Sequence, residues 1–137
     1  MPAYLLDTGI LIRHLRKRPG YRELVQRLNQ GGDVYISAFT RVEVLRGMRD
    51  HERARTFVLL DSFSTHVIDR STADQAGEWL RAWQARGILL GGPDAVIAAS
   101  ALQAGAALVT TNARHFPMPE LVVLAADENG QITAVNH

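Results

Sequence analysis

Short apolar runs alternate along the chain with stretches of helical periodicity. The runs are rich in aliphatic and β-branched residues, and turn signals bound most of them. Such runs predict short buried strands. The five predicted strands are Ala3–Leu6, Val34–Ser37, Thr65–Ile68, Ala107–Thr110 and Leu121–Leu124.

The segments between these strands place apolar residues three and four positions apart, which predicts amphipathic helices. Pro19-Gly20 separates the first two helices, and Gly31-Gly32 ends the second. The last helix is apolar nearly all round, so we expect it to be buried against the sheet. The predicted helices are Gly9–Lys17, Tyr21–Asn29, Thr40–Met48, Glu52–Leu60, Ser71–Arg86 and Asp94–Gln103.

Strands that alternate with helices predict an α/β fold, with a parallel sheet between helical layers. The length of 137 residues suits one domain, 1–137, and the sequence has no internal repeat or linker. Asn129-Gly130 is a turn signal. The polar segment from about residue 126 is therefore either a tail or a hairpin that ends in Ile132–Val135.

Composition excludes several classes of protein. The chain has no cysteine, which excludes a disulfide scaffold, a thiolate zinc site and a cysteine nucleophile. With 47% hydrophobic and 21% charged residues, it can form a core. The sequence has neither a signal-peptide pattern nor an apolar run long enough to span a membrane. We therefore expect a cytoplasmic protein with no membrane association.

The net charge of +1 conceals an asymmetry along the chain. Residues 1–60 hold 11 Lys/Arg and 6 Asp/Glu, whereas residues 61–137 hold 4 and 8. Basic Arg13, Arg16, Lys17 and Arg18 lie on or directly after the first predicted helix. These side chains could hold an RNA backbone, because basic patches attract phosphates. The alternative is an ordinary solvated helix face.

Polar residues follow several of the predicted strands. Asp7 ends the first strand, Glu43 lies early in the helix after the second, and Asp94 opens the buried helix. Asn112 follows the fourth strand by two residues. In open α/β sheets, ligands bind beyond the carboxyl ends of the strands, where the strand order reverses. These four side chains can therefore converge at one edge of the sheet.

Each of these residues also has a purely structural interpretation. Asp7 and Asp94 are suitable helix N-caps. Thr40 and Glu43 have the spacing of a capping box. Asn112 suits an Asx-turn.

The acids together favour a metal site. Three carboxylates at one edge of an apolar sheet repel each other unless a cation neutralises them. Oxygen ligands select Mg²⁺ or Mn²⁺ over zinc or copper, and no pair of histidines has metal-ligand spacing. Magnesium held by carboxylates suits phosphodiester hydrolysis, because the metal activates water and stabilises the leaving oxygen.

Four blocks of the sequence, in order from residue 3 to about 124, resemble the PIN domain of bacterial VapC-type toxins. Each block is weak alone, but their order and spacing make the combination fairly specific. The blocks are Leu5-Leu6-Asp7-Thr8, Ser37-x5-Glu43-x3-Gly47, Asp94-Ala-x-Ile-Ala98-Ala and Thr110-x-Asn112-x2-His115-Phe116.

The resemblance implies a three-layer α/β/α domain with a five-stranded parallel sheet. It also implies a Mg²⁺- or Mn²⁺-dependent endoribonuclease in which metal-activated water attacks the phosphodiester, leaving a 3′-hydroxyl and a 5′-phosphate. By this resemblance Asp7, Glu43 and Asp94 are the catalytic acids, and Asp7 and Asp94 are assigned as metal ligands. Thr8 and Thr110 lie where the family often has a hydroxyl near the site. They could orient Asp7 or a metal-bound water. The alternative is a local hydrogen bond at a turn or strand end.

Asn112 departs from the family pattern, which often has a fourth acid there. An amide brings no negative charge, so we expect one well-occupied metal site. The resemblance further implies a homodimer and a small antitoxin partner. The apolar residues of the helices from Val42 to Leu60 are the expected antitoxin groove.

Alternative functions differ in their sequence requirements. A receiver-like signalling domain needs an acidic pair after the first strand and a strand-end lysine, whereas this chain has Asp7 alone there and a single lysine, Lys17. A dehalogenase-like phosphatase needs a second aspartate at position 9, which is glycine. A non-catalytic PIN-like module that binds RNA or a partner stays open. Trp79 and Trp83 are expected in the core rather than stacked on bases.

Overall fold

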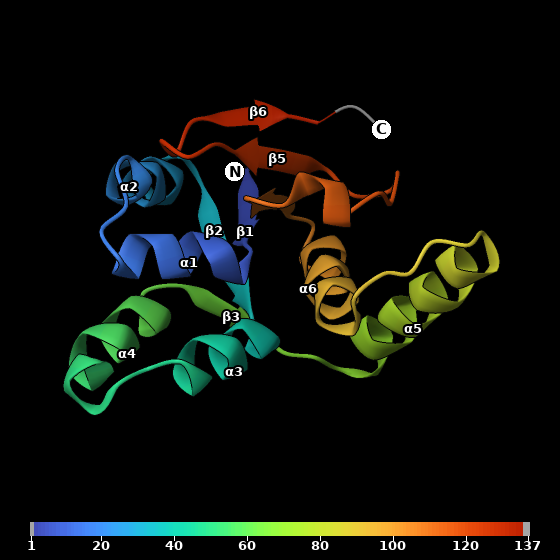
Figure 1. Ribbon diagram of the computed structural model, residues 1–137, viewed down its shortest axis with the longest axis horizontal. Coiled ribbons are helices and arrows are strands. Elements are labelled where there is room, and N and C mark those ends of the chain that lie inside the picture. The colour runs from blue at the N-terminus through green and yellow to red at the C-terminus, as the bar shows by residue number, and fades with distance from the viewer. Residues whose placement is uncertain (1, 136–137) are drawn as a thin grey trace.

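A six-stranded sheet forms the centre of the computed structural model, which describes residues 2–135 (Figure 1). The strand order is β3-β2-β1-β4-β5-β6. The first five strands along the chain are mutually parallel, and β6 is antiparallel to β5. The strands are β1 (Ala3–Leu6), β2 (Asp33–Ser37), β3 (Ser64–His66), β4 (Ala107–Thr110), β5 (Val123–Ala126) and β6 (Ile132–Ala134).

Helices cover both faces of the sheet, which confirms the three-layer α/β/α architecture (Figure 1). The helices α1, α2 and α4 lie on one side, and α5 and α6 lie on the other. Two short 3₁₀ turns, η1 (Asp50–Glu52) and η2 (Ala113–His115), complete the elements. The helices are α1 (Thr8–Leu15), α2 (Tyr21–Gly31), α3 (Ala38–Arg46), α4 (Arg53–Asp61), α5 (Arg70–Ala85) and α6 (Gly92–Gln103).

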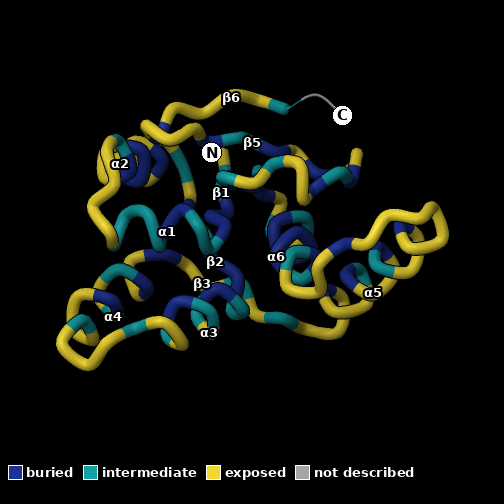
Figure 2. The backbone as a smooth tube through the Cα atoms, in the orientation of Figure 1, coloured by how far each residue is buried: buried dark blue, intermediate teal, exposed yellow. Residues whose placement is uncertain are grey.

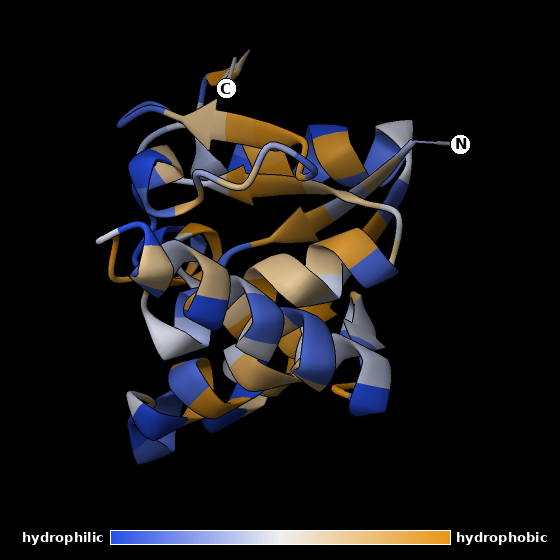
Figure 3. Cartoon of the chain, turned by 90° about the vertical axis from the view of Figure 1, so that its right-hand side faces the viewer, coloured by the Kyte–Doolittle hydropathy of each residue, from blue (hydrophilic) through white to orange (hydrophobic). Residues whose placement is uncertain are grey.

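The hydrophobic core has two halves, one on each face of the sheet. Leu5 and Leu108 pack in the half beneath α5 and α6, whereas Leu6 and Val109 pack in the half beneath α1 and α2. This division follows from the pleat, because successive side chains of a strand point to opposite faces. The central strands and α6 are accordingly buried in Figure 2, and Figure 3 shows hydrophobic strands beneath helices with hydrophilic outer surfaces.

The helix α6 is buried along most of its length, as expected. Ala95, Ala98 and Ala99 are fully buried. Their small side chains let the helix lie close to both the sheet and α5. Trp79 and Trp83 are also buried in this half of the core, so their prediction as core residues is confirmed. Nε1 of Trp79 donates a 2.8 Å hydrogen bond to Glu120.

The sheet differs from the expected five parallel strands by one added antiparallel strand. The C-terminal segment forms a hairpin in which β6 pairs with β5. Oδ1 of Asp127 accepts hydrogen bonds from the backbone N–H groups of Asn129 and Gln131, and Gly130 adopts a φ of 74°. The predicted fifth strand, Leu121–Leu124, is displaced, because β5 begins at Val123.

The order of strands reverses between β1 and β4. From β1 the chain crosses to β2 on one side, and β4 continues the sheet on the other. The backbone N–H of Asp7 donates to the carbonyl of Val109 at 2.9 Å, which joins the two strands at their carboxyl ends. This switch point is where a ligand site is expected in an α/β sheet. Within residues 2–135, no helix has the length and hydropathy to cross a membrane.

Candidate functional site

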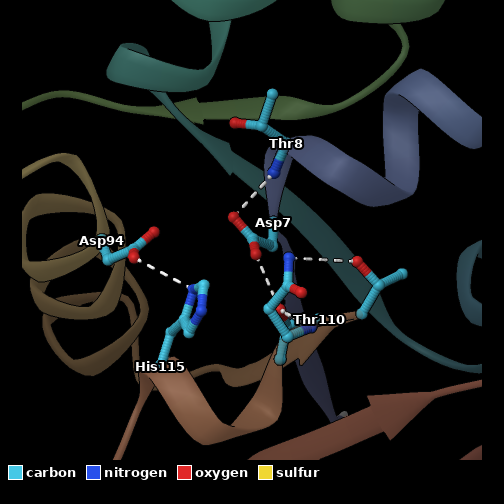
Figure 4. A network of polar contacts seen from close by, with 7 residues as sticks. Asp7, Thr8, Asp94, Thr110 and His115 are labelled. Carbon is cyan, nitrogen blue, oxygen red and sulfur yellow. Dashed lines mark hydrogen bonds and ion pairs between the residues drawn. The ribbon is translucent and has the colours of Figure 1, made fainter. Parts of the chain in front are cut away.

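Asp7 lies at the switch point, between the end of β1 and the start of α1 (Figure 4). Its side chain is 6% exposed. Oδ1 accepts a 2.9 Å hydrogen bond from the backbone N–H of Thr8, and Oδ2 accepts a 2.7 Å hydrogen bond from the hydroxyl of Thr110. Asp7 is therefore the N-cap of α1, as the structural interpretation predicted. The cap occupies Oδ1, and the carboxylate is held in place by the first residue of α1 and the last residue of β4.

Glu43 is held by Thr8 from the neighbouring strand end. The hydroxyl of Thr8 donates to Oε1 of Glu43 at 2.6 Å. The predicted capping box is wrong, because α3 begins at Ala38 and its N-cap is Ser37, whose hydroxyl accepts from the N–H of Phe39. Thr40 lies inside the helix, and its hydroxyl is hydrogen-bonded to that of Thr8 at 3.1 Å. Through its side chain, Thr8 thus orients Glu43 rather than Asp7.

Asp94 lies in the first turn of α6, and not at its N-cap as predicted. The helix begins at Gly92, and the N-cap is Gly91. Oδ2 of Asp94 faces Nδ1 of His115 at 3.4 Å (Figure 4). A Cβ atom on Gly91 would lie 3.2 Å from the same oxygen. A glycine at position 91 therefore leaves room for the Asp94 carboxylate.

The three acids interact electrostatically. Burial raises the pKa of Asp7, as do the charges of Asp94 and Glu43, while hydrogen bonds from Thr110 and Thr8 lower it. Burial also raises the pKa of Asp94; the nearby His115 lowers it and the charge of Glu43 raises it. A nearby cation would therefore favour the ionised forms of Asp7 and Asp94.

The donor set fits a hard divalent cation. Three carboxylates meet at one sheet edge, and oxygen is the ligand atom that Mg²⁺ and Mn²⁺ prefer. Glu43 faces Thr8 and Asp94 faces His115. Accordingly, no group of three acidic, histidine or cysteine side chains in residues 2–135 is already arranged as a metal cage. A cation here would draw Glu43 and Asp94 from these partners.

Thr110 and Asn112 border Asp7 at the end of β4. The hydroxyl of Thr110, which is fully buried, accepts a 3.0 Å hydrogen bond from the backbone N–H of Asn112. The amide nitrogen of Asn112 is 3.5 Å from the hydroxyl of Thr111. The predicted Asx-turn is absent, because the Asn112 side chain makes no capping hydrogen bond to the turn η2. Its exposed amide is free to meet a ligand.

A cleft beside the acids, which we call the arginine cleft, contains most of the predicted RNA-binding residues. It has a volume of about 330 Å³, and its lining includes Arg13, Arg16 and Arg18 together with Thr8 and Asn112. Lys17 borders a different cavity, between α1, α2 and α4. Lys17 follows the end of α1 with a φ of 56°, so its backbone leaves the helical path. Arg18 is the third basic residue of the cleft.

His115 is the one residue beside the acids to which the sequence analysis gave no role. Its ring contacts Asp94 although 21 positions separate them. The signal was present in the block Thr110-x-Asn112-x2-His115, where His115 follows a strand end that was already assigned to the site. The turn η2 places it opposite the first turn of α6.

Comparisons with known proteins identify the family of this chain. Residues 4–119 match the PIN domain family. Ribonuclease VapC19 of Mycobacterium tuberculosis is 34% identical over 119 residues, which is 85% of this chain and 95% of that protein. Ribonuclease VapC10 of the same species is also 34% identical, over 85% of this chain and 87% of that protein.

Solved structures share the fold. A chain of a toxin–antitoxin complex from Klebsiella pneumoniae superposes with a TM-score of 0.71 at 30% identity, covering 87% of this chain and 95% of that one. A chain of VapBC2 from Rickettsia felis, bound to a promoter DNA fragment, superposes with a TM-score of 0.76 at 23% identity, covering 88% and 96%. The match over residues 4–119, together with these similarities, places the chain in the PIN domain family, among the VapC-type proteins.

Proposed function

We propose that this protein is a Mg²⁺- or Mn²⁺-dependent endoribonuclease, and that it is the toxin of a toxin–antitoxin pair acting in the cytoplasm. The observation that carries the proposal is the buried, doubly hydrogen-bonded Asp7, with Glu43 and Asp94 beside it at the switch point. The ribonuclease names of relatives at 34% identity support the reaction class.

Asp7, Glu43 and Asp94 would hold the metal, with Asp7 and Asp94 as its direct ligands. When bound, the cation would supply the Lewis acidity that activates water and stabilises the leaving oxygen. Thr110 fixes the orientation of the Asp7 carboxylate, and Thr8 fixes that of Glu43. Asp7 is thus held ready for a cation, whereas Glu43 and Asp94 would have to turn from Thr8 and His115 to reach it.

The arginine cleft would bind the RNA backbone beside the acids. Within residues 2–135, neither Arg13 nor Arg16 nor Arg18 is in an ion pair, so their charges are not neutralised by the fold. Contacts with phosphate oxygens position the strand without reading its sequence. RNA held there passes close to Thr8 and Asn112, which also line the cleft.

The antitoxin would occupy the cavity of about 650 Å³ between α1, α2 and α4. Only part of the expected groove is available, because Val44 and Leu60 are buried in the core. Val58 is 72% exposed, and it lines this cavity with Leu59. Four basic side chains from the same lining (Lys17, Arg18, Arg22 and Arg55) favour an amphipathic segment with acidic flanks. The solved toxin–antitoxin complexes of similar proteins support this partner.

The nuclease proposal is tested by incubating the purified protein, free of other chains, with a broad RNA pool. Parallel reactions contain Mg²⁺, Mn²⁺ or a chelator. We expect metal-dependent cleavage by the wild type and by Asp74→Asn, an exposed acid on α5, and no cleavage by Asp7→Asn. Equal behaviour of all three proteins in every buffer would favour the non-catalytic binding module instead.

The partner proposal is tested by titrating synthetic amphipathic helical peptides. We expect a peptide with acidic flanks to bind the wild type more tightly than a peptide with basic flanks. The Val58→Glu variant should lose this preference, because it adds a negative charge to the cavity wall. Equal binding of both peptides to both proteins would rule out the cavity as the docking site.

A homodimer is the expected assembly of the free protein.

A further inference from the structure

Another cavity borders Asp94, on the side opposite the arginine cleft. Its volume is about 340 Å³, and it shares no lining residue with the cleft. Asp94 and His115 form one wall, and the loop between α5 and α6 forms another. In Figure 4, Asp94 and His115 lie to one side of Asp7, and α1 lies to the other. Asp94 therefore borders this cavity, while the cleft with the three arginines lies on the α1 side of Asp7.

The loop presents apolar side chains to this cavity. Leu89 is 87% exposed and Ile88 is 40% exposed, and both line it. Leu90 is buried and anchors the loop to the core formed by α5 and α6. Exposed aliphatic side chains lose contact with water when a ligand covers them, which favours binding. Because Leu89 is mostly exposed, it contributes little to the core. Packing of the fold therefore does not account for an aliphatic side chain at position 89.

The chemistry of the walls matches a nucleobase. Aliphatic side chains and the ring of Pro117 offer flat apolar contacts, and the imidazole of His115 and the guanidinium of Arg114 are groups on which bases stack. A phosphate is a poorer occupant, because the Asp94 carboxylate lines this cavity. The three arginines of the opposite cleft are the better site for the backbone.

The position of Asp94 determines which nucleotide along the RNA can place its base in this cavity. Because its carboxylate belongs to both the acidic cluster and the cavity wall, a group in the cavity lies directly beside the reacting phosphate. The base of a nucleotide that flanks that phosphate is within reach. A base in a duplex is stacked and paired, and it would have to leave the helix to enter.

We propose that the cavity lined by Ile88, Leu89 and Pro117 binds the unstacked base of the nucleotide next to the scissile phosphate. The protein then acts on unpaired RNA, with the backbone in the arginine cleft and one base in this cavity. The inference rests on the proposed nuclease function for the identity of the scissile phosphate. The cavity itself can be tested through binding alone.

The test measures binding of a short single-stranded RNA by fluorescence anisotropy, in an Asp7→Asn background that prevents cleavage. The RNA carries one abasic nucleotide at each position in turn. The loop variant Ile88→Ala/Leu89→Ala is compared with Val67→Ala, an exposed valine that borders neither cavity. The same RNA annealed to its complement serves as the duplex.

We expect the loop variant to weaken single-strand binding roughly tenfold, in line with the loss of one stacked base. One abasic position should cause a similar loss, and the two losses should not add, because both remove the same contact. Val67→Ala should bind as the parent does. Duplex RNA should bind less tightly than the single strand and be insensitive to the loop variant.

Losses that add, or a loop variant that binds normally, would overturn the proposal. A change in oligomeric mass of the loop variant, measured by light scattering, would assign the loop to contact between copies of this chain and would also overturn it. If the wild type cleaves RNA with metal but the loop variant binds normally, the base site is wrong and the nuclease proposal stands. If the losses in binding are non-additive but no RNA is cleaved, the base site stands and the nuclease proposal is wrong. Absence of RNA binding overturns both.

Discussion

The hydroxyl of Thr110 donates a 2.7 Å hydrogen bond to Oδ2 of Asp7, across 103 positions of sequence. Both groups are buried at the carboxyl ends of adjacent strands, β4 and β1. The same hydroxyl accepts from the N–H of Asn112, so its proton is directed at the carboxylate. This bond fixes one oxygen of the central acid of the site.

Thr110→Val should remove this bond and leave buried polar groups without a partner. We expect a loss of about 1–3 kcal/mol in the free energy of unfolding. The affinity for Mn²⁺ should also fall, because Asp7 is no longer held. Chemical denaturation and calorimetric titration measure the two effects. Ser100→Ala is the control: it removes a buried hydroxyl that contacts Ser37, and it should lower stability while leaving Mn²⁺ affinity unchanged.

Asp7→Asn should remove a pH-dependent loss of stability from the metal-free protein. Burial raises the pKa of Asp7 above its ordinary value of 3.8, so the folded protein holds this proton more tightly than the unfolded chain. Between 3.8 and the raised value, stability falls as the pH rises, and above that window the cost is fully present. The variant lacks this cost, although its amide offers one acceptor oxygen in place of two to Thr8 and Thr110. Its stability relative to the wild type should therefore rise with pH across the window.

Thermal unfolding in chelator across this pH range measures the effect. Mn²⁺ should raise the melting temperature of the wild type, because it binds only the folded state. It should leave the melting temperature of Asp7→Asn unchanged. A difference in stability between the variant and the wild type that stays constant across this pH range would contradict this electrostatic account of Asp7.

Arg16→Ala should weaken RNA binding, whereas Lys17→Ala should not. These neighbours in sequence line different cavities, and only Arg16 borders the cleft beside the acids. Losing one phosphate contact should reduce the slope of log affinity against log salt by about 0.7 for single-stranded RNA. Equal losses for both variants would indicate a diffuse basic surface rather than a defined cleft.

Gly91→Ala should displace the Asp94 carboxylate. The backbone φ of Gly91 is −70°, which alanine adopts without strain, but the added Cβ would lie 3.2 Å from Oδ2. We therefore expect nearly unchanged stability with weaker metal binding and slower cleavage. Gly92→Ala is the matched control, since a Cβ there has no neighbour within 4 Å. Similar activity of the two variants would show that this contact is without consequence.

The sequence was sufficient to predict the parallel α/β class and the strands that lead to the site, because buried parallel strands are continuous apolar runs. The acids Asp7, Glu43 and Asp94 could be grouped because each follows a strand end or opens a helix that returns to that edge. The structure brings them near one another, with Thr8 hydrogen-bonded to both Asp7 and Glu43 and Thr110 hydrogen-bonded to Asp7. Their metal-binding role stays a prediction.

Details that depend on backbone geometry were not predictable in the same way. Ser37 takes the N-cap of α3 because it ends β2 directly, so the cap lies three residues before the expected Thr40. Lys17 leaves the cleft because the chain turns through a left-handed conformation at that position. The block Thr110-x-Asn112-x2-His115 places His115 near the site, but its contact with Asp94 depends on the tertiary packing of η2 against α6, which local spacing does not specify.

The chemistry of the RNA ends after cleavage tests the central claim most directly. Purified wild-type protein is incubated with RNA in Mn²⁺ and in chelator, beside Asp7→Asn, and the termini of the products are determined. Hydrolysis by a water molecule at a carboxylate-held metal predicts 5′-phosphate and 3′-hydroxyl ends that form only with metal and only with the wild type. Products with 2′,3′-cyclic phosphate ends, or cleavage that persists in chelator or in Asp7→Asn, would contradict the assignment of Asp7, Glu43 and Asp94 as a metal-dependent hydrolytic site.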